Sequence, residues 1–275
     1  MLKRAYLEIT NVCNLSCAFC PGTKREPRFL TEEEFRVLAG KLRGRTQYLY
    51  LHLMGEPLLH PLLGRFLEIA EEYGLPVILT TNGTLLREKG ELLCAAKALH
   101  KVSLSLQSFE ANEGGCLEEY LTDCAAFAKR AAEAGKICEL RLWNIGGLER
   151  RNTEITAFLE KEFPGPWSRG RGGWKLREDV WLEPGQRFDW PELTAEDRGE
   201  ACFCYGLRDQ VGILADGTVV PCCLDHEGDV PLGNLLEQEL DEILSSERAR
   251  AIYEGFSQRR AVEALCRRCG FARKF

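Results

Sequence analysis

Residues Ala5 to Gly22 read AYLEITNVCNLSCAFCPG, a β-rich run that passes directly into three closely spaced cysteines. The run from Ala5 to Thr10 predicts a strand. Cys13, Cys17 and Cys20 follow it with the spacing C-x3-C-x2-C. The loop after a strand is where α/β folds place their chemistry. This triplet is therefore the first candidate site.

Thiolates are ligands both for zinc and for iron-sulfur clusters. A structural zinc site needs a fourth Cys or His close by. No histidine precedes His52, and Pro21-Gly22 follows the third cysteine. Three cysteines can instead bind three irons of a 4Fe-4S cube and leave the fourth iron without a protein ligand. The triplet favours this second arrangement, in which the open iron is a place for chemistry.

Beyond the triplet, β-rich runs alternate with helical patterns, which indicates repeated βα units around a parallel sheet. Five strands are expected at Ala5 to Thr10, Tyr48 to Leu53, Val77 to Thr81, Val102 to Leu106 and Ile137 to Leu142, with a sixth at Val180 to Leu182. Helices are expected at Leu62 to Tyr73, Leu85 to Ala98, Glu118 to Ala134 and Thr153 to Phe163, and a capping box of Thr31 and Glu34 begins another. These units are too few for a closed eight-stranded barrel. The predicted fold is α/β, a partial (β/α)6-type TIM barrel.

The C-terminal third has a different pattern. Pro, Gly, Trp and Arg dominate residues 164–173, which predicts a long loop and a domain seam. A hairpin then turns at Asp216-Gly217, and helices follow at Leu236 to Leu244 and Ser246 to Gly255. We expect a core domain over residues 1–185 and a small α+β domain over residues 186–275.

Composition argues against several classes of protein. Of the 275 residues 45% are hydrophobic, so the chain can bury a sizeable core. The net charge of -6 argues against general affinity for nucleic acid or anionic membrane, which surplus Lys and Arg drive. No apolar run approaches the ~20 residues that span a bilayer, and Met1 to Arg4 lead into a strand instead of a signal segment. We expect a cytoplasmic protein with no nucleic-acid or membrane partner.

Thirteen cysteines in a reducing compartment point to metal or redox chemistry more than to disulfides. Nine of them fall into two groups, the triplet and a C-terminal set of Cys202, Cys204, Cys222, Cys223, Cys266 and Cys269. The other four are scattered between these groups. Two of those, Cys94 and Cys124, lie in helical patterns beside Leu and Ala and are expected to be small buried apolar residues.

With its triplet spacing and the aromatic Phe19 before the last cysteine, the sequence resembles the radical S-adenosylmethionine (radical SAM) superfamily. The resemblance implies a 4Fe-4S cluster on Cys13, Cys17 and Cys20 whose open iron takes the amino and carboxylate groups of S-adenosylmethionine. It also implies reductive cleavage to a 5′-deoxyadenosyl radical, which abstracts a hydrogen from the substrate. An external electron donor such as flavodoxin or ferredoxin is then a partner.

Further motifs resemble the family's motifs in the expected order along the chain. Leu53-Met54-Gly55-Glu56-Pro57 resembles its Gly-Gly-Glu-Pro motif, with Met54 in place of the first Gly, and Thr80 to Thr84 resembles its T-N-G turn. The S-adenosylmethionine-binding residues implied in this way are Phe19, Gly55, Glu56, Asn82, Ser105 and Arg141, with Asn144 beside them. Each motif alone is more often an ordinary turn or a satisfied polar residue. Their joint order carries the argument.

The C-terminal set supplies a second cluster. Cys204 and Cys222, which the hairpin brings together, combine with the C-x2-C of Cys266 and Cys269 as four ligands of an auxiliary 4Fe-4S cluster. Cys202 and Cys223 are the alternative ligands, and zinc is the alternative metal. The region resembles the auxiliary-cluster domain called Twitch, a truncated relative of SPASM, in Asp216-Gly217, Pro221-Cys222 and Leu232 to Leu235.

An auxiliary cluster with four protein ligands can only pass electrons, which favours a net oxidation of the substrate, a dehydrogenation. Resemblance to an aminocyclitol dehydrogenase favours a small polar substrate. A maturase of a ribosomally synthesised peptide, forming a crosslink, a thioether or an epimerised residue, is the rival, and a non-catalytic electron carrier is a third class. No catalytic base is assigned, because His52 and His60 are expected to be structural or surface residues. Loop residues that could line a substrate pocket, or simply face solvent, are Arg169, Arg171 and Trp174.

Overall fold

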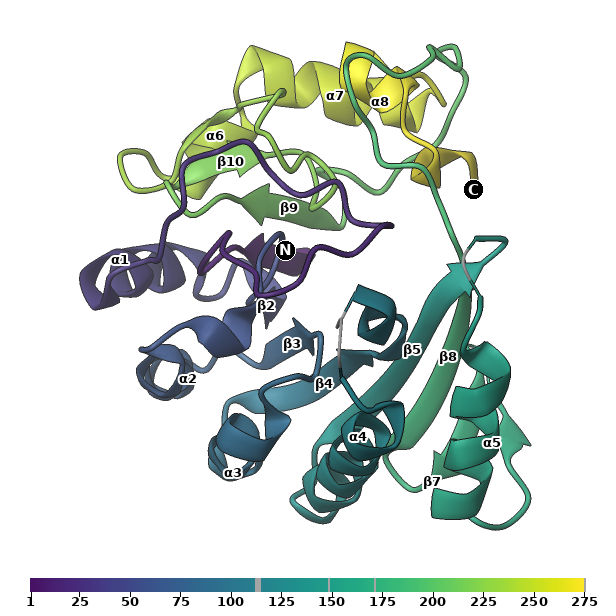
Figure 1. The fold of residues 1–275 in the computed structure, drawn as a ribbon. Coiled ribbons are helices and arrows are strands. Elements are labelled where there is room, and N and C mark those ends of the chain that lie inside the picture. Colours follow the sequence, from purple (N-terminus) through teal and green to yellow (C-terminus); the bar gives the residue numbers. More distant parts are fainter. Residues whose placement is uncertain (112–114, 148, 171, 275) are drawn as a thin grey trace.

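Six parallel strands form the centre of the computed structural model, which describes residues 1–111, 115–147, 149–170 and 172–274. The strands are neighbours in the order β1 (Leu2–Leu7), β2 (Thr46–Tyr50), β3 (Val77–Thr81), β4 (Leu99–Ser105), β5 (Ile137–Ile145) and β8 (Val180–Gln186). The helices between them are α1 (Glu32–Leu42), α2 (Leu63–Glu72), α3 (Leu86–Ala95), α4 (Leu117–Glu133) and α5 (Asn152–Glu162). Figure 1 shows the strands along a curved line with these helices on its outer side. The predicted partial (β/α)6 barrel is confirmed.

Alternation along each strand divides the sheet into two faces of opposite character. On β5, Cys138, Leu140 and Leu142 belong to the hydrophobic core, whereas Glu139 and Arg141 between them contact polar groups of neighbouring strands. Successive side chains of a strand point to opposite faces. The apolar face therefore packs against the helices, and the inner face of the partial barrel is polar.

Local sequence signals account for the helix boundaries. The capping box is formed as predicted: the Thr31 side chain accepts from the Glu34 N–H, and the Glu34 carboxylate accepts from the Thr31 N–H. Short 3-10 helices follow β2, β4 and α8, at Pro57–Leu59, Leu106–Ala111 and Phe271–Lys274. Observed helix ends lie within about three residues of the predicted ones in the core.

The segment 164–173 departs from the prediction. Instead of a long loop at a domain seam, it contributes β6 (Ser168–Arg169), which pairs with β7 (Trp174–Arg177) and through it with β8 as an antiparallel edge. A Cβ on Gly173 would lie 2.0 Å from the carbonyl oxygen of Leu182, so this glycine permits a close strand approach. Gly170, Gly172 and Gly173 lie between the paired strands β6 and β7.

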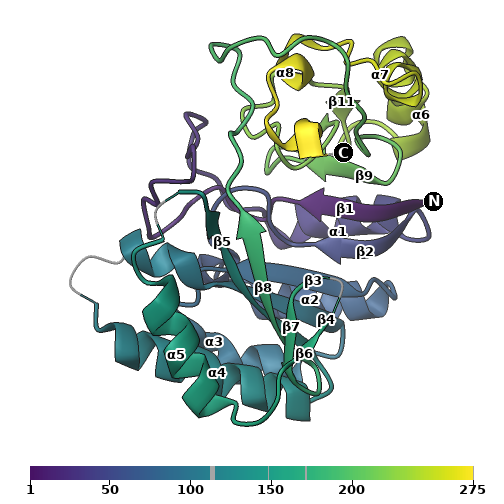
Figure 2. The same cartoon turned by 90° about the vertical axis from the view of Figure 1, so that its right-hand side faces the viewer.

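The C-terminal region joins the same sheet at its other edge. Strand β9 (Gln210–Ile213) pairs in parallel with β1, and β10 (Thr218–Val220) and β11 (Gly233–Asn234) continue it in antiparallel fashion. The predicted hairpin is confirmed. Helices α6 (Leu240–Leu244), α7 (Glu247–Ser257) and α8 (Ala264–Arg267) lie on the far side of it from the barrel (Figures 1 and 2). Helix α6 begins four residues later than predicted, because Glu239 caps it.

The predicted boundary between residues 185 and 186 falls at the end of β8. The chain then runs without helix or strand to β9, apart from isolated bridges. In the part of the chain that the structure describes, none of the helices has the length and apolar character needed to cross a membrane.

Candidate functional site

The cysteine triplet lies in the loop between β1 and α1, at the carboxyl ends of the parallel strands. Cys13 and Cys20 are exposed and Cys17 is half-buried, and the Cys20 N–H donates to the Cys17 carbonyl at 3.0 Å. Burial, and then the neighbouring Cys20 and Cys13, raise the pKa of Cys17 to about 12. These sulfurs are thus close enough to oppose each other's ionisation. A cationic iron centre reverses this by binding the thiolates, so the donor set fits a cluster.

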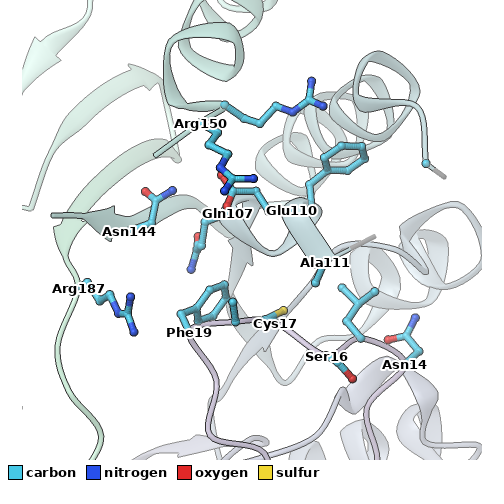
Figure 3. A pocket seen from close by; sticks show the side chains of 15 residues that line it. Asn14, Ser16, Cys17, Phe19, Gln107, Glu110, Ala111, Asn144, Arg150 and Arg187 are labelled. Carbon is cyan, nitrogen blue, oxygen red and sulfur yellow. The ribbon is translucent and has the colours of Figure 1, made fainter. Parts of the chain in front are cut away.

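A cavity of about 730 Å³ opens beside the triplet. Cys17 and Phe19 line it from the triplet loop, residues 11–30, and Gln107 and Asn144 line it from the ends of β4 and β5. Figure 3 shows Phe19 and Cys17 at one side of this space and Asn144 and Arg187 at another. The cavity has room for a cofactor and a substrate next to the candidate iron site.

Gly55 brings the second motif directly against the triplet loop. Its φ is +76°, and a Cβ there would lie 2.4 Å from the Thr10 carbonyl oxygen. The next residue, Glu56, donates its N–H to the Val12 carbonyl at 2.8 Å. Gly55 therefore lets the backbone of this turn lie directly against the backbone that leads into the triplet. Met54 is 5% exposed and packs with Leu214 of the C-terminal hairpin, which gives a local reason for a large residue there.

Glu56 holds two motifs together. It is 2% exposed, and its carboxylate accepts from the Thr81 hydroxyl and the Asn82 N–H at 2.7 Å each and from the Leu58 N–H at 3.0 Å. Burial raises its pKa to about 6 in spite of these hydrogen bonds. The structure thus gives the Glu56 carboxylate intramolecular partners, whereas the family resemblance implies that Glu56 binds S-adenosylmethionine.

Asn82 connects the third strand to the triplet. Its side-chain amide donates to Asn14 Oδ1 at 2.8 Å and lies 4.0 Å from Cys13 Sγ. Its carbonyl accepts from the hydroxyls of Tyr120 and Ser108 at 2.8 and 3.2 Å. The backbone of this turn is therefore fixed by Tyr120 and Ser108, while the Asn82 side chain faces the triplet loop.

Ser105 and Arg141 lie opposite each other in the register of β4 and β5. Ser105 is half-buried at the carboxyl end of its strand. The Arg141 guanidinium lies 2.8 Å from Glu139 and 3.5 Å from Glu183, and it stacks over the Trp143 ring at 4.5 Å. Arg141 therefore already neutralises carboxylates on the inner face of the barrel.

Glu8 is a functional candidate that the sequence reading missed. It is fully buried and forms two 2.7 Å hydrogen bonds with the Arg25 guanidinium. Its carboxylate also accepts at 3.1 Å from the backbone N–H groups of Met54 and Ala215. One carboxylate thus joins β1, the triplet loop, the Gly55 turn and the C-terminal hairpin. The sequence does contain a signal for this role. Glu8 is a lone charged residue inside the strand predicted at Ala5 to Thr10, and a buried carboxylate needs several partners.

The two histidines near the second strand are not exposed to solvent. His60 accepts at Nδ1 from the Leu62 N–H and contacts the Leu30 carbonyl through Nε2, both at 3.1 Å, so its role is structural as expected. Burial, and then Arg141 and Lys101, lower the pKa of His52 to about 3. A buried histidine with this pKa is neutral at pH 7.

The C-terminal cysteines form a second group, here called the C-terminal cysteine cluster. A cavity of about 160 Å³ is lined by Cys204, Cys222, Cys223, Cys266 and Cys269. Burial raises the pKa of Cys204 to about 11, and burial followed by the other four thiols raises that of Cys222 further. Cys202 is buried close to Cys204 but does not line this cavity. Five neighbouring thiols in a small enclosed space fit a metal cluster held by four of them.

Cys223 lies beside two polar residues of β1, Tyr6 and Arg4. Burial raises its pKa to about 12, while a hydrogen bond with Tyr6 and the charge of Arg4 oppose that rise. Across the described ranges no three His, Cys, Asp or Glu side chains converge on one metal ion. A cubane does not require such convergence, because each cysteine binds a different iron.

The remaining predicted pocket residues lie away from this site. Arg169 is on β6 and Trp174 on β7, where the guanidinium lies 5.9 Å from the indole ring. Arg171 lies outside the described residues. Cys124 is buried beside Gly83, as expected for a small apolar residue, and Cys94 is half-buried.

Comparisons with known proteins agree with this geometry. SuiB of Streptococcus suis bound to S-adenosylmethionine has a TM-score of 0.65 at 17% identity, over 93% of this chain and 68% of that one. BtrN in complex with AdoMet and 2-DOIA has 0.58 at 17%, over 98% and 93%. The protein anSMEcpe with bound AdoMet and the Cp18Cys peptide has 0.62 at 14%, over 91% and 82%. At these identities the likeness shows the fold, and no curated protein matches the sequence.

Two family models match separate parts of the sequence. Residues 7–139 match the radical SAM superfamily, and residues 202–270 match SPASM, the iron-sulfur cluster-binding domain. The first range contains the triplet and the Gly55 and Asn82 motifs, and the second contains the C-terminal cysteine cluster. The chain therefore carries a radical SAM domain followed by a SPASM iron-sulfur domain.

Proposed function

We propose that the protein is a radical SAM enzyme that cleaves S-adenosylmethionine and abstracts a hydrogen atom from a substrate in the 730 Å³ cavity. The observation that carries the proposal is the meeting of three loops: the Gly55 turn and Asn82 both contact the triplet loop, and that loop lines the cavity. When bound, the cluster and S-adenosylmethionine supply reductive cleavage and hydrogen-atom abstraction.

The residues have separate proposed roles. Cys13, Cys17 and Cys20 hold the radical SAM cluster. S-adenosylmethionine binds along the edge formed by Phe19, Gly55, Glu56, Asn82, Ser105 and Arg141. Within that set, Glu56 acts by fixing the Asn82 turn against the Gly55 turn, since its carboxylate is already occupied by Thr81 and Asn82. A rigid edge of this kind orients the cofactor and excludes water from the reacting atoms.

Cys204, Cys222, Cys266 and Cys269 are the proposed ligands of the auxiliary 4Fe-4S cluster, with Cys223 beside them as a hydrogen-bonding neighbour. Four cysteine ligands would leave no iron free for substrate, and the 160 Å³ cavity is small and enclosed. This supports electron transfer, and therefore a net oxidation of the substrate with the auxiliary cluster as acceptor. A flavodoxin or ferredoxin in a reducing cytoplasm would reduce the first cluster.

Modification of a ribosomally made peptide is the second candidate. SuiB bound to the precursor peptide SuiA matches 99% of this chain with a TM-score of 0.61 at 18% identity. The anSMEcpe structure also contains a peptide, whereas the BtrN structure contains 2-DOIA. The wide cavity is compatible with a peptide side chain as well as with a small molecule.

The test is anaerobic reconstitution with iron and sulfide, followed by dithionite and S-adenosylmethionine. We expect release of 5′-deoxyadenosine and about eight irons per chain, four for each cluster. The variant Cys17→Ala should release none, and Cys94→Ala, changed on α3 away from both groups, should behave as the wild type. Wild-type protein that contains iron but releases no 5′-deoxyadenosine would contradict the proposal.

A further inference from the structure

The 730 Å³ cavity beside the triplet has a distinctive charge. Three arginines line it, Arg150, Arg151 and Arg187, against one carboxylate, Glu110. Arg151 is paired, since its guanidinium lies 3.1 Å from Glu154. Within the described ranges no ion pair engages Arg150 or Arg187. Two guanidiniums from different segments thus line a shared space with Glu110, and among the described residues neither is ion-paired with it.

This positive lining contrasts with the rest of the molecule. The chain has a net charge of -6, and half-buried arginines such as Arg25 and Arg141 are paired with carboxylates, whereas Arg150 and Arg187 are exposed at the cavity. A cleft lined by one sign of charge concentrates ligands of the opposite sign. Guanidinium groups bind carboxylates with strong, oriented hydrogen bonds.

Gln107 adds an independent polar signal. Its side chain is 7% exposed, lines the cavity, and has an Oε1 atom with no hydrogen-bond partner among the described residues. A buried carbonyl without a donor costs free energy unless a ligand supplies one. The neighbouring Asn144 is held by Asn152, since each of the two side-chain amides donates to the other at 2.9 Å.

We propose that the substrate of this enzyme carries a carboxylate, held by Arg150 and Arg187, and an N–H or O–H group that donates to Gln107 Oε1. An acidic residue of a peptide and a free amino or hydroxy acid share this chemistry. The inference rests on the proposed function. It adds the substrate class. It assigns Arg150, Arg187 and Gln107 to the substrate, whereas Gly55, Asn82 and Ser105 belong to the edge proposed for the cofactor.

Binding of four probes to the reconstituted holoenzyme with S-adenosylmethionine tests the inference by calorimetry. The probes are glutamate, glutarate, a hexaglutamate peptide and a hexalysine peptide. We expect the acidic probes to bind and hexalysine not to bind. Arg150→Gln and Arg187→Gln should each weaken acidic binding about tenfold. Arg43→Gln, an exposed arginine after α1, is the matched control and should change nothing. Tighter binding of hexaglutamate than of glutamate indicates a peptide, and the reverse indicates a small acid.

The variant Gln107→Leu tests the hydrogen bond from the substrate to Gln107 separately from the binding of the substrate carboxylate by the arginines. It should abolish the preference for glutamate over glutarate, which lacks the amino group, and leave glutarate binding within about twofold. The inference is overturned if no acidic probe binds, if hexalysine binds equally, or if the arginine variants lose affinity for S-adenosylmethionine instead. Release of 5′-deoxyadenosine without any probe tests the proposed function separately, so the two can fail independently.

Discussion

The two cysteine groups differ in how far the chain encloses them. In the triplet, Cys13 and Cys20 are exposed beside a cavity of about 730 Å³. In the C-terminal cysteine cluster, Cys269 is buried and the cavity measures about 160 Å³. The same ligand chemistry therefore occurs once beside a large space and once beside a small one. Under the proposed function, the space beside the sulfurs, more than the sulfurs themselves, distinguishes the reaction site from the electron-transfer site.

The largest expected effect is at the cysteine triplet. Cys17→Ser should remove about four irons per chain and reduce release of 5′-deoxyadenosine below detection, because the radical SAM cluster loses a ligand. Iron analysis and chromatography of the quenched reaction measure both. Cys94→Ser is the control. Full release from the variant would show that the triplet is not the reaction site.

In the C-terminal cysteine cluster, Cys266→Ser should also remove about four irons, yet 5′-deoxyadenosine release should stay within about threefold of the wild type. Product formation should stop, because the electron outlet is lost. Cys202→Ser, in the same domain but in the hydrophobic core, should keep all the iron. If Cys202→Ser loses iron and Cys266→Ser does not, the ligand assignment is wrong.

The buried link between the two groups is Glu8. Glu8→Gln should lower the free energy of unfolding by about 3 kcal/mol, since Arg25 would lose its charged partner in a largely buried position. Urea unfolding measures this. Glu72→Gln breaks an exposed pair with Arg36 and should cost below about 1 kcal/mol. Equal effects of the two variants would rule out a special role for the buried pair.

The smallest expected effect is that of Gly44→Ala, set against the same change at a glycine of similar conformation, Gly55. Gly55→Ala places a Cβ 2.4 Å from the Thr10 oxygen, whereas Gly44→Ala, with φ +70°, meets no atom within 4 Å. Gly44→Ala should cost about 1–2 kcal/mol from φ alone. Gly55→Ala should cost about 1–3 kcal/mol more and also reduce 5′-deoxyadenosine release, because the motif must move away from the triplet loop. Thermal unfolding and the release assay distinguish the two, and identical behaviour would show that the contact at Gly55 is unimportant.

The core fold was predictable because its signals are local. The capping box at Thr31, the Asp216-Gly217 turn and the alternation along β5 each depend on a few adjacent residues, and each appears in the structure. The edge strands β6 and β7 were missed because a glycine-rich segment can be a linker or a tight strand approach. Only the position of the Leu182 carbonyl decides between them.

The candidate site was predictable in its position but not in its internal bonding. Cysteine spacing indicates ligands directly, whereas the contacts of Glu8, Glu56 and Arg141 depend on groups far away in the sequence. Glu8 and Ala215, for example, are 207 residues apart. Charge on a strand residue indicates that a partner exists, and it does not identify the partner. The arginines beside the cavity were not singled out, because exposed arginines are common in any loop.

The pairing of β9 with β1 makes the order of synthesis important (Figure 2). Strand β1 gains one neighbour, β2, early in synthesis, and its other neighbour, β9, only after about 200 more residues. At about 5–20 residues per second, that delay is about 10–40 s. Throughout it, the edge of β1 is unpaired and Glu8 lacks the Ala215 N–H. A nascent chain in this state is exposed to pairing with other chains, so yields should depend on translation speed and on chaperones that cover the first strand.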